Sequence, residues 1–397
     1  MNPKKERNTM KTKRIFLMVM DSFGIGGAKD AARFGDSGSD TLRSLVRTGN
    51  FEAPTLASLG LFHINGIDPS LAKTKPVGAY GRLCEQSEGK DSTIGHWELA
   101  GIRSYEPLPT YPNGFPPEVL GELERRWGRR ALCNKPYSGT DVIRDYGKEH
   151  LETGALIVYT SVDSVMQIAA HEDVVPTEEL YRICEIAREF LSGEHCVGRV
   201  IARPFTGEWP FKRTSGRHDY SAVPPKKTVL DLLRENGLDT IAVGKINDIY
   251  AGVGISEAIR TASNEDGMSI AYGLLSRDFR GLCAVNFVDF DTVYGHRRNA
   301  VGYAEAVMKL DAWLKDFIAN MREDDVLMIT ADHGCDPMYA GTDHTRENVP
   351  ILVYGQNVKP ANLGVRESFS DVAATVADML EIPYDLNGES FKGDLGL

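Results

Sequence analysis

The sequence lacks the marks of a disulfide-stapled or membrane-spanning protein. Its six cysteines include no CxxC pair, so we expect reduced thiols rather than a disulfide framework or a zinc knuckle. The longest wholly apolar run near the start, Ile15 to Met20, is far shorter than the roughly 20 residues that cross a bilayer. No small-residue cleavage site precedes this run, and we therefore expect a cytoplasmic protein with no membrane partner.

Positive charge is also in short supply. The chain carries 45 Lys and Arg against 56 Asp and Glu, a formal net charge of -11. Because nucleic acids and anionic membranes bind positive potential, this balance argues against both as partners. A dinucleotide loop is missing too, since Lys29 stands where the third glycine should follow Gly24 and Gly26. An anionic ligand must therefore be held by a local basic cluster or by metal ions.

What is present indicates an α/β fold. The 397 residues, 42% of them apolar, leave room for two domains. Short β-branched and apolar runs alternate with helical patterns, which is typical of parallel strands joined by crossover helices. The predicted strands are 15–20, 156–162, 240–246, 282–288, 326–330 and 350–354, and helices are predicted at 177–191 and 301–321.

Two proline-rich passages, 108–119 and 222–227, suggest the hinges of an inserted domain. We accordingly expect a core of residues 1–106 and 225–397 and an insert of residues 107–224. The alternative is that the two passages are exposed loops of a single domain.

Acidic residues and histidines follow the predicted strands. Asp21 comes directly after the first strand, at the sheet edge where open α/β folds collect ligands. Later strands are followed by four acids and three histidines: Asp289, Asp291, Asp332 and Asp343, with His296, His333 and His344. Oxygen and imidazole ligands indicate Mn²⁺, Zn²⁺ or Mg²⁺, and their number indicates two ions. Taken singly, Asp21 is more often a cap residue, and each histidine more often a satisfied imidazole.

A polar loop at 89–98, GKDSTIGHWE, places two hydroxyls at the start of a predicted helix. A hydroxyl beside a divalent ion loses its proton more easily, and a helix start can hold a phosphate. Ser92 or Thr93 is therefore a candidate nucleophile, although either residue alone is more often an N-cap.

Asp21, the loop GKDSTIGHWE and the stretches NFVDFDTVYGHRR, TADHG and GTDHTRE occur in the order and spacing of bacterial phosphopentomutases. The chain resembles this branch of the alkaline phosphatase superfamily from Arg14 to its C-terminus. The resemblance implies an alkaline-phosphatase-like core, with a mostly parallel sheet flanked by helices, and an inserted α/β cap domain that binds sugar phosphate.

The resemblance also implies a dinuclear site, usually of manganese. One ion would be held by Asp291, His296 and His344, and the other by Asp21, Asp332, His333 and the nucleophile. Ser92 stands where the family commonly has the phosphorylated threonine, and Thr93 is the second candidate. Cys335 stands where asparagine is frequent, either as an oxidation-sensitive thiol or as an inert buried one.

The insert carries the basic cluster that an acidic protein needs for a sugar phosphate. Between Val197 and His218 there are five Lys and Arg and one acid. Similarity to the family assigns Arg199 and Arg213 to the distal phosphate. It assigns a further set to the sugar: Ser161, Asp163 and Lys245.

The implied activity interconverts the 1- and 5-phosphates of ribose and deoxyribose through a phosphorylated enzyme, primed by a sugar bisphosphate. Small-molecule pentose phosphates are then the partners. Two alternatives stay open on the residues alone. One is a metal-dependent phosphomonoesterase or another phosphosugar mutase of the same superfamily, and the other is a non-catalytic sugar-phosphate sensor.

Overall fold

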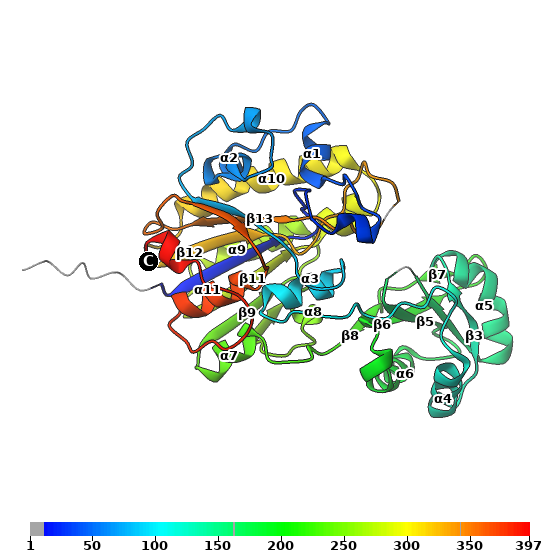
Figure 1. The fold of residues 1–397 in the computed structure, drawn as a ribbon. Coiled ribbons are helices and arrows are strands. Elements are labelled where there is room, and N and C mark those ends of the chain that lie inside the picture. The colour runs from blue at the N-terminus through cyan, green and yellow to red at the C-terminus, as the bar shows by residue number, and fades with distance from the viewer. Residues whose placement is uncertain (1–11, 162, 342) are drawn as a thin grey trace, which may run out of the picture. The chain divides into compact units, whose positions relative to one another are not determined.

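A computed structural model of the 397-residue chain describes residues 12–161, 163–341 and 343–397 (Figure 1). Residues 1–11, and the last residue of the predicted strand 156–162, lie outside these described residues. The chain divides into two compact units. The core unit is the described part of Met1–Glu106 together with Pro224–Leu397, and the insert unit is Pro107–Val223.

The core unit is built on one eight-stranded sheet in the order β10-β9-β11-β1-β12-β13-β2-β14. Strands β10, β9, β11, β1 and β12 run parallel, and β14 runs parallel to β2. Only β13 runs against its two neighbours. The strands are β1 (Arg14–Met20), β2 (Ala79–Leu83), β9 (Asp239–Val243), β10 (Glu257–Ile259), β11 (Gly281–Phe287), β12 (Asp325–Thr330), β13 (Val349–Tyr354) and β14 (Asn362–Arg366). The mostly parallel α/β sheet predicted from the sequence is confirmed.

Two details of the strand prediction are wrong. The predicted parallel strand 350–354 is the antiparallel β13. Residues 331–341 and 343–348, which precede it, contain no helix, and a parallel connection needs a crossover element that carries the chain back. The predicted strand 240–246 ends at Val243, because Gly244 turns the chain with φ of +79° and Ile246 already begins a helix.

Helices cover both faces of the core sheet (Figure 1). The amphipathic helix α10 packs against α1, α2 and α9, whereas α3 packs against α8 and α11 on the other side. The helices are α1 (Thr41–Val46), α2 (Pro54–Leu59), α3 (Ser92–Leu99), α7 (Val229–Glu235), α8 (Ile246–Ile249), α9 (Asn264–Leu274), α10 (Ala300–Ala319), α11 (Asp371–Met379) and α12 (Lys392–Leu395). Within the described ranges, none of the helices combines the length and apolarity needed to cross a bilayer.

The insert unit has its own mixed sheet, ordered β3-β4-β5-β6-β7 with β8 also paired to β6. Its strands are β3 (Ala131–Pro136), β4 (Leu156–Thr160), β5 (Val165–His171), β6 (Arg199–Thr206), β7 (Lys212–Arg213) and β8 (His218–Ser221). Its helices are α4 (Pro117–Trp127), α5 (Asp141–Thr153) and α6 (Thr177–Phe190). Helices α4 and α6 contribute to one apolar cluster, and α5 contributes to a second. The insert unit therefore has a hydrophobic core of its own.

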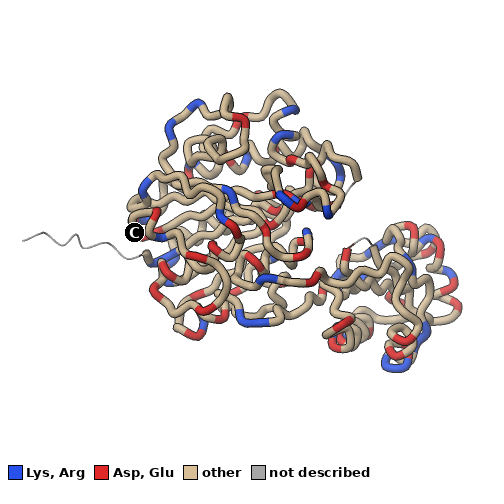
Figure 2. Tube along the Cα trace, in the orientation of Figure 1, with Lys and Arg blue, Asp and Glu red and all other residues tan. Residues whose placement is uncertain are grey.

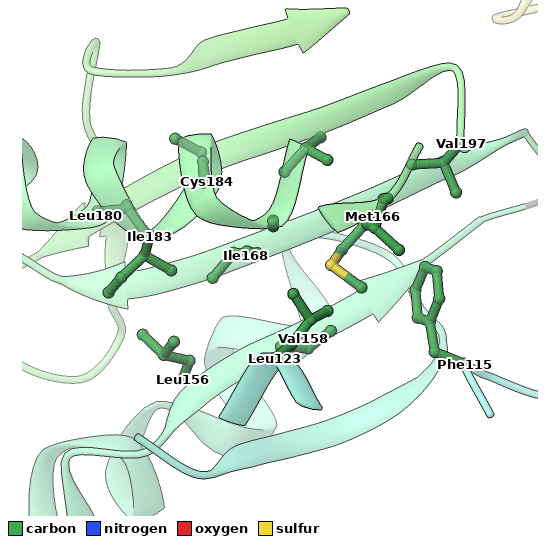
Figure 3. Packing of buried hydrophobic residues seen from close by; sticks show 14 of the residues in the cluster. Phe115, Leu123, Leu156, Val158, Met166, Ile168, Leu180, Ile183, Cys184 and Val197 are labelled. Carbon is green, nitrogen blue, oxygen red and sulfur yellow. The ribbon is translucent and has the colours of Figure 1, made fainter. Parts of the chain in front are cut away.

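The larger of these clusters holds α6 on its sheet (Figure 3). Leu180, Ile183 and Cys184 of α6 pack with Met166 and Ile168 of β5, and Leu180 has no exposed surface. Positions 180, 183, 184 and 187 recur at helical spacing, which is why this stretch forms an amphipathic helix.

We expect Leu180→Ala to destabilise the insert unit by about 2–5 kcal/mol, because it removes a fully buried side chain and leaves a cavity. Urea unfolding of the full chain measures this loss. Ala substitution of the exposed Leu151 is the control, and an equal loss in the two variants would contradict the proposed core.

Candidate metal centre and nucleophile

The sheet order brings distant ligand candidates to one edge. Strand β1 lies between β11 and β12 and runs parallel to both, so the carboxyl ends of the three strands are adjacent. Asp21 follows β1, and Asp332 follows β12 after one residue. Asp291 lies beyond β11 on a π-helical turn, Phe290–Gly295, a rare conformation that occurs mainly at functional sites.

The first candidate cluster comprises Asp21, Asp332 and His333. Their ligand atoms all lie within 4.8 Å of one another, and all three side chains are buried. His333 Nε2 is 3.4 Å from Asp21 Oδ1 and 3.3 Å from Asp332 Oδ2. The structure therefore gathers the protein ligands expected for one ion.

The second cluster comprises Asp291, His296 and His344. Asp291 Oδ2 is 3.3 Å from His296 Nε2, Asp291 Oδ1 is 3.4 Å from His344 Nε2, and the two Nε2 atoms are 3.1 Å apart. Burial raises the pKa of Asp291, but the charge of His344 and the hydrogen bond of His296 outweigh it and hold that pKa well below its usual range. The rings of His333 and His344 stack at 3.9 Å, so the two clusters adjoin.

Within the first cluster, the carboxylates and the histidine stabilise each other's charged forms. Burial alone would raise the pKa of Asp332, but the charges of His333 and His96 lower it to about 2. Burial alone would lower the pKa of His333, but the carboxylates of Asp332 and Asp21 hold it well above its usual value. In the protein without metal, the imidazolium of His333 thus offsets the buried carboxylates, a role that a bound cation can take over.

The carboxylate oxygens themselves fit a metal ion. Asp21 Oδ1, Asp291 Oδ1 and Asp332 Oδ2 are buried and accept no hydrogen bond of acceptable geometry from the described residues. A buried polar atom without a partner is costly, and divalent cations bound at the two clusters would satisfy these oxygens. The donor set of carboxylates and imidazoles suits a hard or borderline ion such as Mn²⁺, Mg²⁺ or Zn²⁺.

Backbone carbonyls orient two of the imidazoles. His344 Nδ1 is 3.0 Å from Lys90 O, and His333 Nδ1 is 3.1 Å from Gly334 O. Because Nδ1 is the donor in each case, Nε2 is left to face the cluster, which is the orientation that a metal-binding imidazole needs.

Ser92 places its hydroxyl at the edge of the first cluster. It is the first residue of α3, and its Oγ is 3.0 Å from His333 Nε2. Asp91 caps this helix by accepting hydrogen bonds from the N–H groups of Thr93 and Ile94. At Gly95 an added Cβ would lie 2.0 Å from Asp332 O, so only glycine permits this close approach of α3.

Two polar residues near the first cluster were not assigned a role from the sequence. Asn286 Nδ2 donates to Asp21 Oδ2 at 3.0 Å, and His96 Nδ1 lies 3.1 Å from Asp332 Oδ2. Both side chains are buried and orient a candidate ligand. The available signal was a single polar residue in the otherwise apolar strand β11 and a histidine one helical turn after Ser92.

Glu347 connects the segments that carry the ligands. Its carboxylate accepts hydrogen bonds from Gly26 N, Thr41 N, Thr41 Oγ1 and Thr345 Oγ1. Burial raises the pKa of Glu347 to about 7, and these hydrogen bonds limit the rise. Gly24 and Gly334 leave room for the carboxylate, since a Cβ at either position would lie within 3 Å of it.

Cys335 lies beside the second cluster. Its Sγ is within 4.8 Å of ligand atoms of both Asp291 and His296. Burial raises the pKa of this thiol strongly, and the nearby carboxylates of Asp291 and Glu347 raise it further. A protonated buried thiol is a poor nucleophile, which favours the inert form of the two alternatives considered from the sequence.

Four of the five predicted substrate-binding residues lie in the insert unit, and Lys245 lies in the core unit. Arg199 Nη2 is 3.7 Å from Asp163 Oδ2, and Ser161 Oγ accepts a hydrogen bond from Asp163 N. Arg213, on β7, is exposed and donates to Gly139 O at 3.2 Å. The insert unit therefore brings Ser161, Asp163 and Arg199 together.

A family model and curated relatives both match nearly the whole chain. A family model of the metalloenzyme superfamily matches residues 13–384. A curated phosphopentomutase of Lachnoclostridium phytofermentans is 55% identical over 382 residues, which cover 96% of this chain and 98% of that protein. Another of Carboxydothermus hydrogenoformans is 53% identical over 386 residues, covering 96% and 99% of the two chains.

Replacing the buried Glu347 by glutamine should alter how the free energy of unfolding depends on pH. Glu347 ionises near pH 4.5 in the unfolded chain but near pH 7 in the folded chain. Its protonated form therefore stabilises the fold below pH 4.5, and this contribution is lost as the pH rises through about 7.

We expect Glu347→Gln to be about 3 kcal/mol more stable than the wild type at pH 8, with the advantage shrinking towards pH 5. The glutamine oxygen can accept both N–H groups, and its NH₂ can donate to both threonine hydroxyls. Urea unfolding with a chelator present measures the effect. The exposed Glu235→Gln is the control, and an identical pH profile for the two variants would refute the assignment.

Proposed function

Because the chain belongs to the phosphopentomutase family within the metalloenzyme superfamily, we propose that it interconverts the 1- and 5-phosphates of ribose and of deoxyribose. The protein is an isomerase with an alkaline-phosphatase-like α/β core, as the sequence motifs indicated. The phosphomonoesterase and sensor alternatives have no specific observation in their favour.

One observation carries the proposed chemistry. Ser92 Oγ, at the start of α3, lies 3.0 Å from His333 Nε2 beside two adjoining clusters of carboxylates and imidazoles. This contact favours Ser92 over Thr93 as the nucleophile. The positive end of the α3 dipole also favours an anion beside Ser92.

The proposed metal ligands divide as the two clusters do. Asp291, His296 and His344 would hold one divalent ion, and Asp21, Asp332 and His333 would hold the other, together with Ser92 Oγ. Divalent metal dependence follows from the family and the two ligand clusters, and we propose Mn²⁺ as the ion. When bound, such ions neutralise phosphoryl oxygens and lower the pKa of a coordinated hydroxyl.

Ser92 carries the phosphoryl group between the two sugar positions. The Oγ–P bond of phosphoserine breaks as a sugar hydroxyl oxygen forms a bond to phosphorus, and the hydroxyl proton is passed to Ser92 Oγ. The resulting pentose bisphosphate returns its other phosphate to Ser92 by the reverse of this step. A pentose bisphosphate is thus the proposed activator of the unphosphorylated enzyme.

The insert unit is proposed to bind the sugar phosphate. Acidic and basic residues are interspersed along the chain (Figure 2), so recognition of an anion depends on a local group. Arg199 and Arg213 are proposed to hold the distal phosphate, because guanidinium makes paired hydrogen bonds to phosphate. Ser161, Asp163 and Lys245 are proposed to contact the sugar.

A cytoplasmic location is part of the proposal. All six cysteines are free, which suits a reducing compartment. No nucleic acid or membrane partner is proposed, and the partners are small pentose phosphates.

We expect a phosphate on Ser92 after incubation with a pentose bisphosphate and Mn²⁺, detected by peptide mass analysis. Ser92→Ala should lose the phosphate and the isomerase activity, since no other hydroxyl contacts His333 among the described residues. Thr93→Val keeps the volume of the neighbouring side chain and serves as the control. A phosphate on Thr93, or an active Ser92→Ala variant, would refute the assignment.

Arg213→Ala should raise KM for ribose 5-phosphate by about 10- to 150-fold, because a charge-assisted contact to phosphate is lost. Steady-state kinetics measure this change. Lys212→Ala, at the exposed neighbouring position on β7, is the matched control. An unchanged KM in Arg213→Ala, or equal losses in the two variants, would remove Arg213 from the proposed binding site.

A further inference from the structure

We propose that Arg346 is a positioning residue that fixes the loop before α3 against the two candidate metal clusters. This loop, residues 84–91, is called the Ser92 loop because it leads into Ser92. This inference rests on the proposed function, because it concerns how Ser92 is held for phosphoryl transfer. Arg346 follows His344 by two residues, and its side chain reaches the loop that leads into α3.

The guanidinium group binds the Ser92 loop at two points. Arg346 Nη1 donates to Gly89 O at 2.6 Å, three residues before Ser92, and Nη2 donates to Glu85 O at 3.0 Å. The Glu85 carboxylate is 2.5 Å from Nη1. The segment from Glu85 to Gly89, between β2 and α3, is thereby fastened to one side chain.

The same arginine is braced from the opposite direction. Its Nε and Nη2 bind the Asp30 carboxylate, with Nη2 at 2.9 Å from Oδ2, and its guanidinium carbon lies 4.8 Å from the centre of the Phe34 ring. Its own N–H donates to Asp36 Oδ2, and that carboxylate also binds Lys90 Nζ at 3.0 Å. Arg346 is therefore also linked to the Ser92 loop indirectly, through Asp36 and Lys90.

Arg346 also shares a short segment with the metal ligands. His344 Nδ1 contacts Lys90 O at 3.0 Å, and Thr345 pairs with Gly334, the residue after His333. Residues 344–346 thus contact both the Ser92 loop and the segment that carries Asp332 and His333. The distance between the Ser92 hydroxyl and the ligand atoms is set by these contacts, and a displacement of about 1 Å can cost 100-fold in rate.

Arg346 cannot act by touching the substrate. Its side chain is only 2% exposed, and its donors are directed to Asp30, Glu85 and Gly89. Its polar side-chain contacts all go to loop residues rather than to strands or helices of the sheet. Lysine keeps the charge but cannot reproduce the planar fork that reaches both carbonyls and both carboxylates.

Arg14 provides a matched control for the loss of a buried arginine. It is fully buried, binds both oxygens of Asp325 at 2.7 Å, and donates to the carbonyls of Leu275 and Arg277. It stands at the first residue of β1, whereas Asp21 follows the last residue of that strand. Arg14→Lys should therefore lower stability without moving the Ser92 loop.

The test compares Arg346→Lys with Arg14→Lys in the full-length, manganese-loaded enzyme. The measured quantities are the rate at which a pentose bisphosphate phosphorylates Ser92, the bound Mn²⁺ per chain, KM and kcat. In Arg346→Lys we expect phosphorylation and kcat to fall by about 10- to 100-fold, with Mn²⁺ content and KM close to the wild type. In Arg14→Lys we expect a lowered melting temperature and an unchanged phosphorylation rate.

The inference is overturned if Ser92 of Arg346→Lys is phosphorylated at the wild-type rate. It is also overturned if the phosphorylation rate falls as far in Arg14→Lys as in Arg346→Lys. Should Arg346→Lys fail to fold, Asp30→Asn is the second variant. Asp30 is partly exposed, and this substitution removes one of the ion pairs of Arg346, so it should give a smaller loss of kcat at unchanged KM. An unchanged kcat in that variant then overturns the inference. A wild-type enzyme that acquires no phosphate on Ser92 refutes the proposed function, and this inference with it.

Discussion

Electrostatic compensation of buried carboxylates is the constraint on which the rest of the structure depends. Asp21, Asp291 and Asp332 each carry a buried oxygen that accepts no hydrogen bond of acceptable geometry from the described residues. Imidazoles of His333 and His344 lie within ion-pair distance and offset part of the cost. Bound cations would complete this compensation, so the fold at this edge and the chemistry proposed for it depend on the same charges.

The core sheet meets this constraint through strand order. Strands β11, β1 and β12 are remote in sequence but adjacent and parallel in the sheet, so their carboxyl ends bring the candidate ligands to one place. The antiparallel β13 contributes differently, because the segment that precedes it crosses the same edge. That segment carries His344, Arg346 and Glu347, which contact the loop before α3 and the loop after β1. Ligand geometry therefore depends on loops as much as on strands.

Sequence reasoning was effective where a residue type is diagnostic and weak where only geometry decides. Asp332-His333 after an apolar run, and the ordered motifs around it, were sufficient to predict which acids and histidines the structure brings together. The direction of β13 was not predictable from its apolar run, because strand direction is set by the connection before it. The role of Asn286 also escaped prediction, since a lone polar residue in a buried strand does not indicate its partner. Arg346 was assigned no role from the sequence, because its burial is visible only in three dimensions.

The insert unit has an apolar core on each side of its sheet. A segment that buries its own side chains can accumulate substitutions, or be exchanged between related chains, without disturbing ligands that are contributed by other stretches of sequence. With substrate recognition placed in the insert unit, as proposed, changes in recognition are separable during evolution from maintenance of the proposed ion-dependent chemistry.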